Sequence, residues 1–125
     1  MKKINHLGIW MDHSIAYIMD LTNDTIGQSI VESEFTHEDK EYGLSRNEKL
    51  MHKKEQHLQL SYYKKLSDII KNYQEVVLFG PTDAKTELLN LLKTDHLFED
   101  IKIEVKHSDK MTENQMQAFV REYFR

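Results

Sequence analysis

The sequence contains no cysteine. It therefore has no disulfide bond, no thiolate nucleophile and none of the common cysteine-based zinc or iron–sulfur sites. A chain without disulfides is most simply placed in a reducing compartment, and we expect a cytoplasmic protein. Long apolar runs are also missing, because Asn5, His6, Asp12 and His13 interrupt the first apolar stretch. We therefore expect neither a signal peptide nor a membrane-spanning segment.

A large excess of positive charge is absent too. Seventeen Lys and Arg residues stand against 21 Asp and Glu residues, which gives a formal net charge of −4. Overall charge does not attract such a chain to a polyanion, so any contact with nucleic acid has to be local. The 125 residues, of which 39% are hydrophobic, suffice for one domain with an ordinary core and leave no room for a second. We expect a single domain over residues 1–125.

The first part of the chain predicts three strands joined by short turns. Two apolar-rich runs, 4–11 and 14–21, are separated by Asp12 and His13, as in a hairpin. Both runs have apolar residues on both faces, which is typical of strands inside a covered sheet. A third run, residues 25–33, is more polar, and we expect it at an edge of the sheet.

The remainder of the chain alternates between helices and strands. An apolar stripe at helical spacing predicts a long helix over 45–73, a stretch without proline or glycine. Further along we expect a buried strand over 75–79, a helix with Ala84, Leu88, Leu91 and Leu92 on its buried face, an edge strand over 101–105, and a last helix that begins with a capping box of Thr112 and Gln115.

The predicted element order is βββαβαβα. Three meandering strands followed by two helix-linked strands give a mixed five-stranded sheet in spatial order 3-2-1-4-5, with helices on both faces. The sequence therefore predicts an α/β fold of ribonuclease H-like topology.

Such a topology suggests nuclease activity, which requires clustered carboxylates that hold two metal ions. The first predicted strand has no carboxylate before Asp12, whose side chain should diverge from that of the adjacent His13 in the turn. The nearest histidine pair on a helix, His52 and His57, has a spacing of five, which places the two side chains on different faces. We therefore expect no enzymatic activity, no metal site and no cofactor.

The turn after the fourth strand is a candidate anion site. It contains Gly80, Pro81 and Lys85 at the start of a helix, where backbone amides lack partners. The turn has neither the second glycine nor the Lys-Ser/Thr pair of a phosphate loop, and Asp83 occupies the positive end of the helix. Two interpretations stay open: a contact for one phosphate of a bound RNA, or an ordinary strand-to-helix turn.

The first half of the long helix lacks an apolar stripe. Residues 45–57 hold two large apolar residues, and four Lys or Arg residues against two carboxylates give a local formal charge of +2. Such a segment can project from the body as a basic arm that contacts phosphates. The alternative is a solvated helix with Glu–Lys pairs. The candidate RNA-binding residues are Arg46, Lys49, His52, Lys53, Lys54 and His57.

The same segments resemble a known family. Residues 46–52 and 62–65 resemble the charged helix in the middle domain of the class-1 peptide-chain release factor of eukaryotes and archaea and of its relative pelota. Residues 77–88 are similar to the strand-Gly-x-x-x-x-Lys-x-Glu-Leu segment of that domain. Stand-alone bacterial translational machinery component-like proteins are more similar still, with counterparts of residues 8–13 and 108–115.

The resemblance implies a ribonuclease H-like domain with a role at the ribosome, but not peptide release. Where the release factor has Gly-Gly-Gln, which positions water at the peptidyl-tRNA ester, this sequence reads Tyr42-Gly43-Leu44-Ser45. We expect a non-catalytic accessory factor of translation that binds the ribosome or ribosomal RNA, with tRNA and a second copy of the chain as further candidate partners. The alternative is a protein-interaction module or homodimeric scaffold.

Overall fold

The computed structural model describes residues 5–22, 25–33 and 48–125, the last range with side chains from Gln56 onward. Three strands come first, β1 (His6–Met11), β2 (Ile15–Thr22) and β3 (Thr25–Glu32). The long helix α2 (Glu48–Ile70) and strand β4 (Glu75–Gly80) follow. The chain then forms helix α3 (Ala84–Leu92), the 3-10 turn η1 (His96–Phe98), strand β5 (Lys102–His107) and helix α4 (Glu113–Tyr123).

The five strands form one mixed sheet in the order β3-β2-β1-β4-β5. β1 pairs antiparallel with β2, and β2 pairs antiparallel with β3. β4 lies parallel to both β1 and β5. The predicted strand order and the ribonuclease H-like topology are therefore confirmed.

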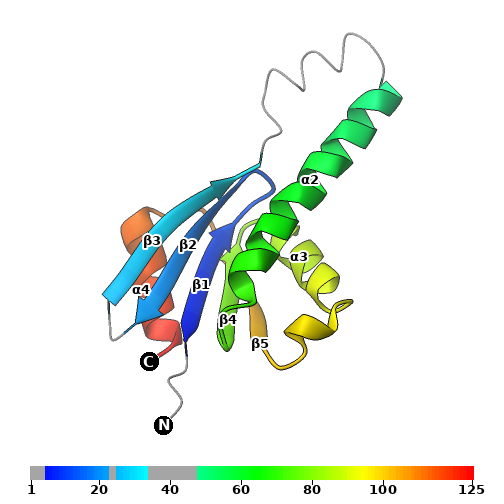
Figure 1. The fold of residues 1–125 in the computed structure, drawn as a ribbon. Coiled ribbons are helices and arrows are strands. Elements are labelled where there is room, and N and C mark those ends of the chain that lie inside the picture. Colours follow the sequence, from blue (N-terminus) through cyan, green and yellow to red (C-terminus); the bar gives the residue numbers. More distant parts are fainter. Residues whose placement is uncertain (1–4, 23–24, 34–47) are drawn as a thin grey trace.

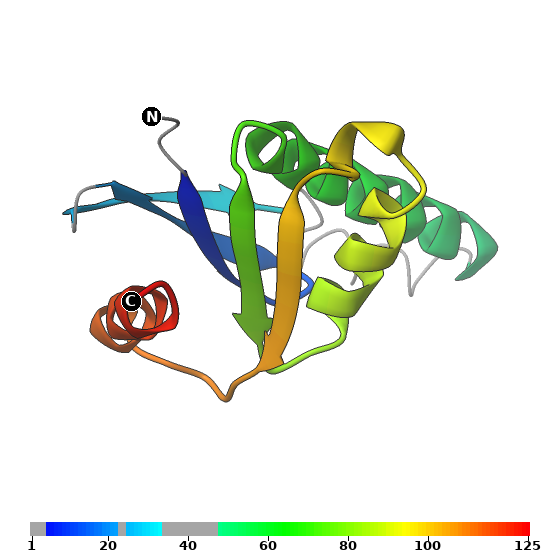
Figure 2. The ribbon, with the colours of Figure 1, turned by 90° about the horizontal axis from the view of Figure 1, so that it is seen from below.

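Helices cover both faces of the sheet (Figure 2), as predicted: α2 and α3 lie on one face and α4 on the other. β1 is buried on both faces, because Leu7 and Ile9 pack into the core under α2 while Trp10 packs into the core under α4. α4 approaches β1 closely at Gly8, where an added Cβ would lie 2.3 Å from Cγ2 of Val120.

The predicted capping box at the start of α4 is confirmed. The Thr112 hydroxyl accepts a hydrogen bond from the Gln115 amide at 3.2 Å, and the Gln115 side chain accepts one from the Thr112 amide at 2.9 Å. This reciprocal pair satisfies two amides that would otherwise lack partners at the helix start.

Two predicted details were wrong. The long helix ends at Ile70 and not at Tyr73, although Tyr73 still packs against the same core and its hydroxyl donates to Asp20 at 2.7 Å. Leu91 was expected on the buried face of α3, but its side chain is 37% exposed, whereas Lys85 is buried on that helix. Helical periodicity shows where the apolar stripe of a helix lies, but it does not show how much of the helix surface the neighbouring elements cover.

The N-terminal part of α2 extends beyond the ends of the strands (Figure 1). The predicted start of this helix at Ser45 lies outside the described residues. No helix in the described part of the chain is both long and apolar enough to cross a membrane.

Candidate functional site

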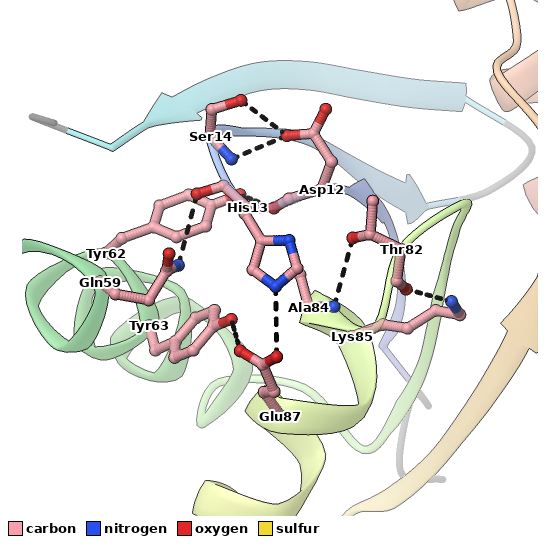
Figure 3. A network of polar contacts seen from close by, with 10 residues as sticks. All are labelled: Asp12, His13, Ser14, Gln59, Tyr62, Tyr63, Thr82, Ala84, Lys85 and Glu87. Atoms are coloured by element: carbon pink, nitrogen blue, oxygen red, sulfur yellow. Dashed lines mark hydrogen bonds and ion pairs between the residues drawn. The ribbon is translucent and has the colours of Figure 1, made fainter. Parts of the chain in front are cut away.

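Two helices and the β1–β2 turn meet where β1 and β4 end (Figure 3). The two strands are parallel, so their carboxyl ends lie side by side, and the β1–β2 turn, α2 and the start of α3 close around them. We call the polar residues gathered here the strand-end cluster; it comprises Asp12, His13, Ser14, Gln59, Tyr62, Tyr63, Thr82, Lys85 and Glu87.

The side chain of Asp12 closes the β1–β2 turn. One carboxylate oxygen, Oδ1, accepts hydrogen bonds from the amide of Ser14 at 2.8 Å, from the hydroxyl of Ser14 at 3.0 Å and from the amide of Ile15 at 2.9 Å. The adjacent His13 instead directs Nε2 toward a carboxylate oxygen of Glu87, 3.2 Å away. The two side chains diverge, as their adjacency in a turn predicted.

Helix α2 holds this turn through two side chains. The hydroxyl of Tyr62 donates to the carbonyl of Asp12 at 3.0 Å, and the side-chain amide of Gln59 donates to the carbonyl of His13 at 3.3 Å. Tyr62 is almost completely buried, and this burial raises the pKa of its phenol far above the usual value. The hydroxyl therefore stays protonated and remains a hydrogen-bond donor.

Glu87 on α3 completes the link between the three elements. Its Oε1 accepts a hydrogen bond from Tyr63 of α2 at 2.7 Å, and its Oε2 contacts His13 of the turn. Burial by itself would raise the pKa of Glu87, but the hydrogen bonds from Tyr63 and His13 outweigh it and the pKa is lowered. The carboxylate is therefore ionised at neutral pH, and both of its oxygens already have partners.

The turn from β4 to α3 depends on a glycine. Gly80 has a φ of 147°, and an added Cβ would lie 2.1 Å from the carbonyl oxygen of Met11 at the end of β1. Only glycine fits such a conformation and such a close approach. The hydroxyl of Thr82 then accepts a hydrogen bond from the amide of Ala84 at 3.2 Å, which satisfies an amide in the first turn of α3.

The predicted anion contact falls on the same turn. Lys85 is 5% exposed, and its ammonium group donates to the carbonyl of Thr82 within its own turn. A phosphate bound by Gly80, Pro81 and Lys85 would have to displace this internal hydrogen bond. The anion site stays a prediction, and the structure supports the alternative of a strand-to-helix turn more directly.

The predicted RNA-binding residues are placed as follows. Arg46 lies outside the described residues, whereas Lys49, His52, Lys53 and Lys54 belong to the N-terminal part of α2. This part of the helix extends beyond the ends of the strands (Figure 1). His57 is exposed to solvent. The structure thus brings five of the six residues onto one projecting helix, and their role stays a prediction.

A further cation on this helix escaped the sequence analysis. Lys49, Lys53, His57 and Lys64 are separated by four, four and seven residues, a spacing that aligns them along one side of a helix. His57 and Lys64 are both exposed. The seven-residue step from His57 to Lys64 is visible in the sequence, but Lys64 lies beyond the basic segment of residues 45–57. His52 falls elsewhere, in the row of Gln59 and Tyr63. The name cationic row is used below for Lys49, Lys53, His57 and Lys64.

Within the described residues, no group of three or more His, Asp or Glu side chains could hold a metal ion. The hydrogen bonds of the strand-end cluster act as a clamp. It joins the β1–β2 turn, α2 and α3, and so sets the direction in which the helix leaves the sheet.

Neither a protein-family model nor a curated protein sequence matches the chain. Among solved structures, the chain resembles Pelota from Archaeoglobus fulgidus, with a TM-score of 0.62 and 8% identity over 97% of this chain and 32% of that one. It also resembles Pelota from Thermoplasma acidophilum, with a TM-score of 0.60 and 16% identity over 94% of this chain and 32% of the other. The chain spans about a third of the length of either protein. The likeness concerns the fold, and at that level it confirms the resemblance to Pelota that the sequence predicted.

Proposed function

We propose that this chain is a non-catalytic accessory factor of translation that acts in the cytoplasm and binds the ribosome or its RNA through helix α2. The observation that carries the proposal is the combination of a Pelota-like fold with a helix that extends beyond the sheet and bears most of the predicted RNA-binding residues. The absence of the Gly-Gly-Gln sequence at residues 42–45 supports a role other than peptide release.

The length and charge of α2 suit a contact with a phosphate backbone. Its 23 residues span about 35 Å at about 1.5 Å per residue. The cationic row repeats a positive or protonatable group every one or two turns along the helix, from the N-terminal part that leaves the body to Lys64, next to the anchored Tyr63. A net charge of −4 for the whole chain means that this attraction is confined to the helix.

The second half of α2 anchors the helix. Leu66 and Ile70 are fully buried against the sheet, and Tyr62 and Tyr63 join the strand-end cluster. A helix held so firmly at one end presents its other end in a defined direction, because an uninterrupted helix transmits its orientation along its length. In this proposal the strand-end cluster positions the basic arm and does not itself contact RNA.

Sedimentation of the tagged full-length chain through sucrose gradients tests the proposal. We expect the chain to migrate with ribosomal particles at low salt, and the double variant Lys53→Glu/Lys54→Glu to remain at the top. A matched control, Lys93→Glu/Lys110→Glu, makes the same charge change at two exposed positions outside α2 and should sediment as the wild type does. Wild-type protein confined to the top of every gradient would refute the proposal.

Binding to purified ribosomes at several salt concentrations then identifies the contact. Each lost phosphate contact should reduce the slope of log affinity against log salt by about 0.7 to 0.9. Lys64→Glu should weaken binding as well, because Lys64 continues the cationic row and is exposed to solvent. An unchanged slope in both variants would show that α2 is not the contact.

A further inference from the structure

The two edges of the sheet differ in how they are protected. β5 carries Lys102 and Lys106 along its six residues, and lysines on an edge strand discourage pairing with another chain. β3, the outermost strand on the other side (Figure 1), has eight residues with no proline, no lysine and no arginine. Its one charged residue, Glu32, stands at its very end. Among the described residues no strand pairs with the outer edge of β3, which therefore suits the addition of another strand.

The register identifies the backbone groups that face outward from β3. The amide of Ser33 donates to the carbonyl of Ser14 at 2.8 Å, so Ser33 belongs to a hydrogen-bonded pair with the chain just before β2. In an antiparallel ladder such pairs alternate along the strand. The odd-numbered residues of β3 are therefore bonded to β2. The amides and carbonyls that point away from the sheet belong to Ile26, Gln28, Ile30 and Glu32.

Side chains on the α4 face add an apolar row that ends at this edge. Phe79, Trp10, Tyr17 and Ile30 occupy directly opposite positions on β4, β1, β2 and β3. The rings of Trp10 and Tyr17 lie 5.8 Å apart, edge to face. The row is buried at Trp10, whereas Ile30 at its end is 50% exposed. An apolar side chain on an added strand would continue the row.

We propose that β3 pairs antiparallel with β3 of a second copy of this chain, across a two-fold axis through Gln28. A two-fold axis perpendicular to the sheet keeps each side chain on its own face, so residues of the same parity must lie opposite one another. The outward-facing amides and carbonyls of the two strands then pair directly. The two five-stranded sheets become one continuous sheet.

The side-chain pairs that each register creates favour an axis through Gln28 over an axis through Ser29 or Ile30. With this axis Ile26 lies opposite Ile30 of the second copy, and the pair occurs twice. An axis through Ser29 would place Ile26 opposite Glu32, and an axis through Ile30 would place Gln28 opposite Glu32. Only the first register matches both isoleucines with isoleucine, and apolar cross-strand pairs stabilise a ladder. Glu32 then lies past the end of the partner strand.

Analytical ultracentrifugation of the purified chain without RNA tests the association. A single pair of short strands buries less area than a standard interface, so we expect a dimer whose population rises with concentration between about 1 µM and about 1 mM. Ile30→Pro removes an amide that β2 does not use, so the internal ladder stays intact while the edge is blocked. Ile30→Lys adds the protecting charge found on β5.

Both Ile30 variants should be monomeric over this range. The matched control is Leu97→Lys, which makes the same kind of change at a residue that is 73% exposed in η1, and it should dimerise as the wild type does. A wild-type chain that stays monomeric would overturn the proposal. So would a dimer that survives both Ile30 substitutions, because its interface would lie elsewhere.

The absence of cysteine makes the register directly testable. Opposite residues in a hydrogen-bonded antiparallel pair have Cα atoms about 5.5 Å apart, which is within the range that a disulfide can bridge. Gln28→Cys should therefore form a disulfide-linked dimer under mild oxidation. Ser29→Cys, whose opposite residue would be Gly27 of the second copy, should do so much more slowly. Faster cross-linking of Ser29→Cys would refute the axis at Gln28.

This inference is independent of the proposed function, since it concerns the outer edge of β3 and not the projecting part of α2, and it is measured without RNA. A chain that binds ribosomes but stays monomeric without RNA would overturn the dimer alone. A dimer without ribosome affinity would overturn the proposed function alone.

Discussion

Substitution of Gly80 by alanine should destabilise the protein severely. The residue has a φ of 147°, which L side chains rarely adopt, and such a strained conformation costs about 1–3 kcal/mol. The new Cβ would also lie 2.1 Å from the carbonyl oxygen of Met11, a backbone atom of β1 that cannot rotate away. Moving two central strands apart adds about 1–3 kcal/mol of lost packing. We expect a total loss of about 4 kcal/mol in the free energy of unfolding.

Two other glycines provide graded controls. Gly27 has no atom within 4 Å of an added Cβ, so Gly27→Ala should change stability by less than about 1 kcal/mol. At Gly8 the added Cβ would lie 2.3 Å from a side-chain atom of Val120, and the cost should be intermediate because α4 can shift.

Urea denaturation is the appropriate assay for this series. The chain has a single tryptophan, Trp10, which is 5% exposed, so its fluorescence reports the loss of the core between β1 and α4. Circular dichroism should give the same midpoint if unfolding is two-state. A Gly80→Ala protein as stable as Gly27→Ala would refute the close approach of the two strand ends on which the geometry of the cluster depends.

Two predictions concern the strand-end cluster itself. Tyr63→Phe removes the hydrogen bond to Glu87 and should cost about 1 kcal/mol of stability by thermal or chemical unfolding, since the acceptor is charged but partly exposed. The folded-state pKa of Glu87 lies below its ordinary value of 4.5. The stabilisation of the fold by the ionised carboxylate is therefore present above about pH 4.5 and is lost as the pH falls through the lowered pKa. In Tyr63→Phe the stability should therefore fall less between pH 5 and pH 3 than in the wild type, and an unchanged acid profile would contradict this assignment. Lys85→Met keeps the buried stem and removes the ammonium group that donates to Thr82, so stability should change by less than about 1 kcal/mol. Ribosome binding should stay within about twofold, which is a change of about 0.4 kcal/mol; a larger loss of binding would mean that Lys85 contacts the ligand after all.

Much of the fold follows from local patterns in the sequence. The polarity of residues 25–33 placed β3 at an edge, and the apolar residues on both faces of residues 4–11 placed β1 in the middle. The capping box of Thr112 and Gln115 joins residues three apart, so its signal lies entirely within one short segment. Alternation and helical spacing are properties of neighbouring residues, which explains why they can be read before the chain is folded.

The candidate site is different, because its contacts join distant residues. His13 and Glu87 are 74 positions apart, and Tyr62 and the Asp12 carbonyl are 50 apart. No periodicity connects such residues, and only the parallel pairing of β1 with β4 brings them to one end of the sheet. The burial of Lys85 was also hidden, since a lysine in a helix sequence normally indicates an exposed position.

The sequence by itself determined which segments become strands and helices, their order across the sheet, and the concentration of positive charge on one half of a long helix. The elements and the charge depend on side chains that are close in the chain, and the strand order follows from the rules by which consecutive elements connect. The tertiary structure alone decided that tyrosine hydroxyls clamp the second half of α2 and that Gly80 lies close against the carbonyl oxygen of Met11. It also decided that the outward backbone groups of β3 are those of its even-numbered residues. Each of these depends on the register between strands and on the packing of helices against them, which no single segment encodes.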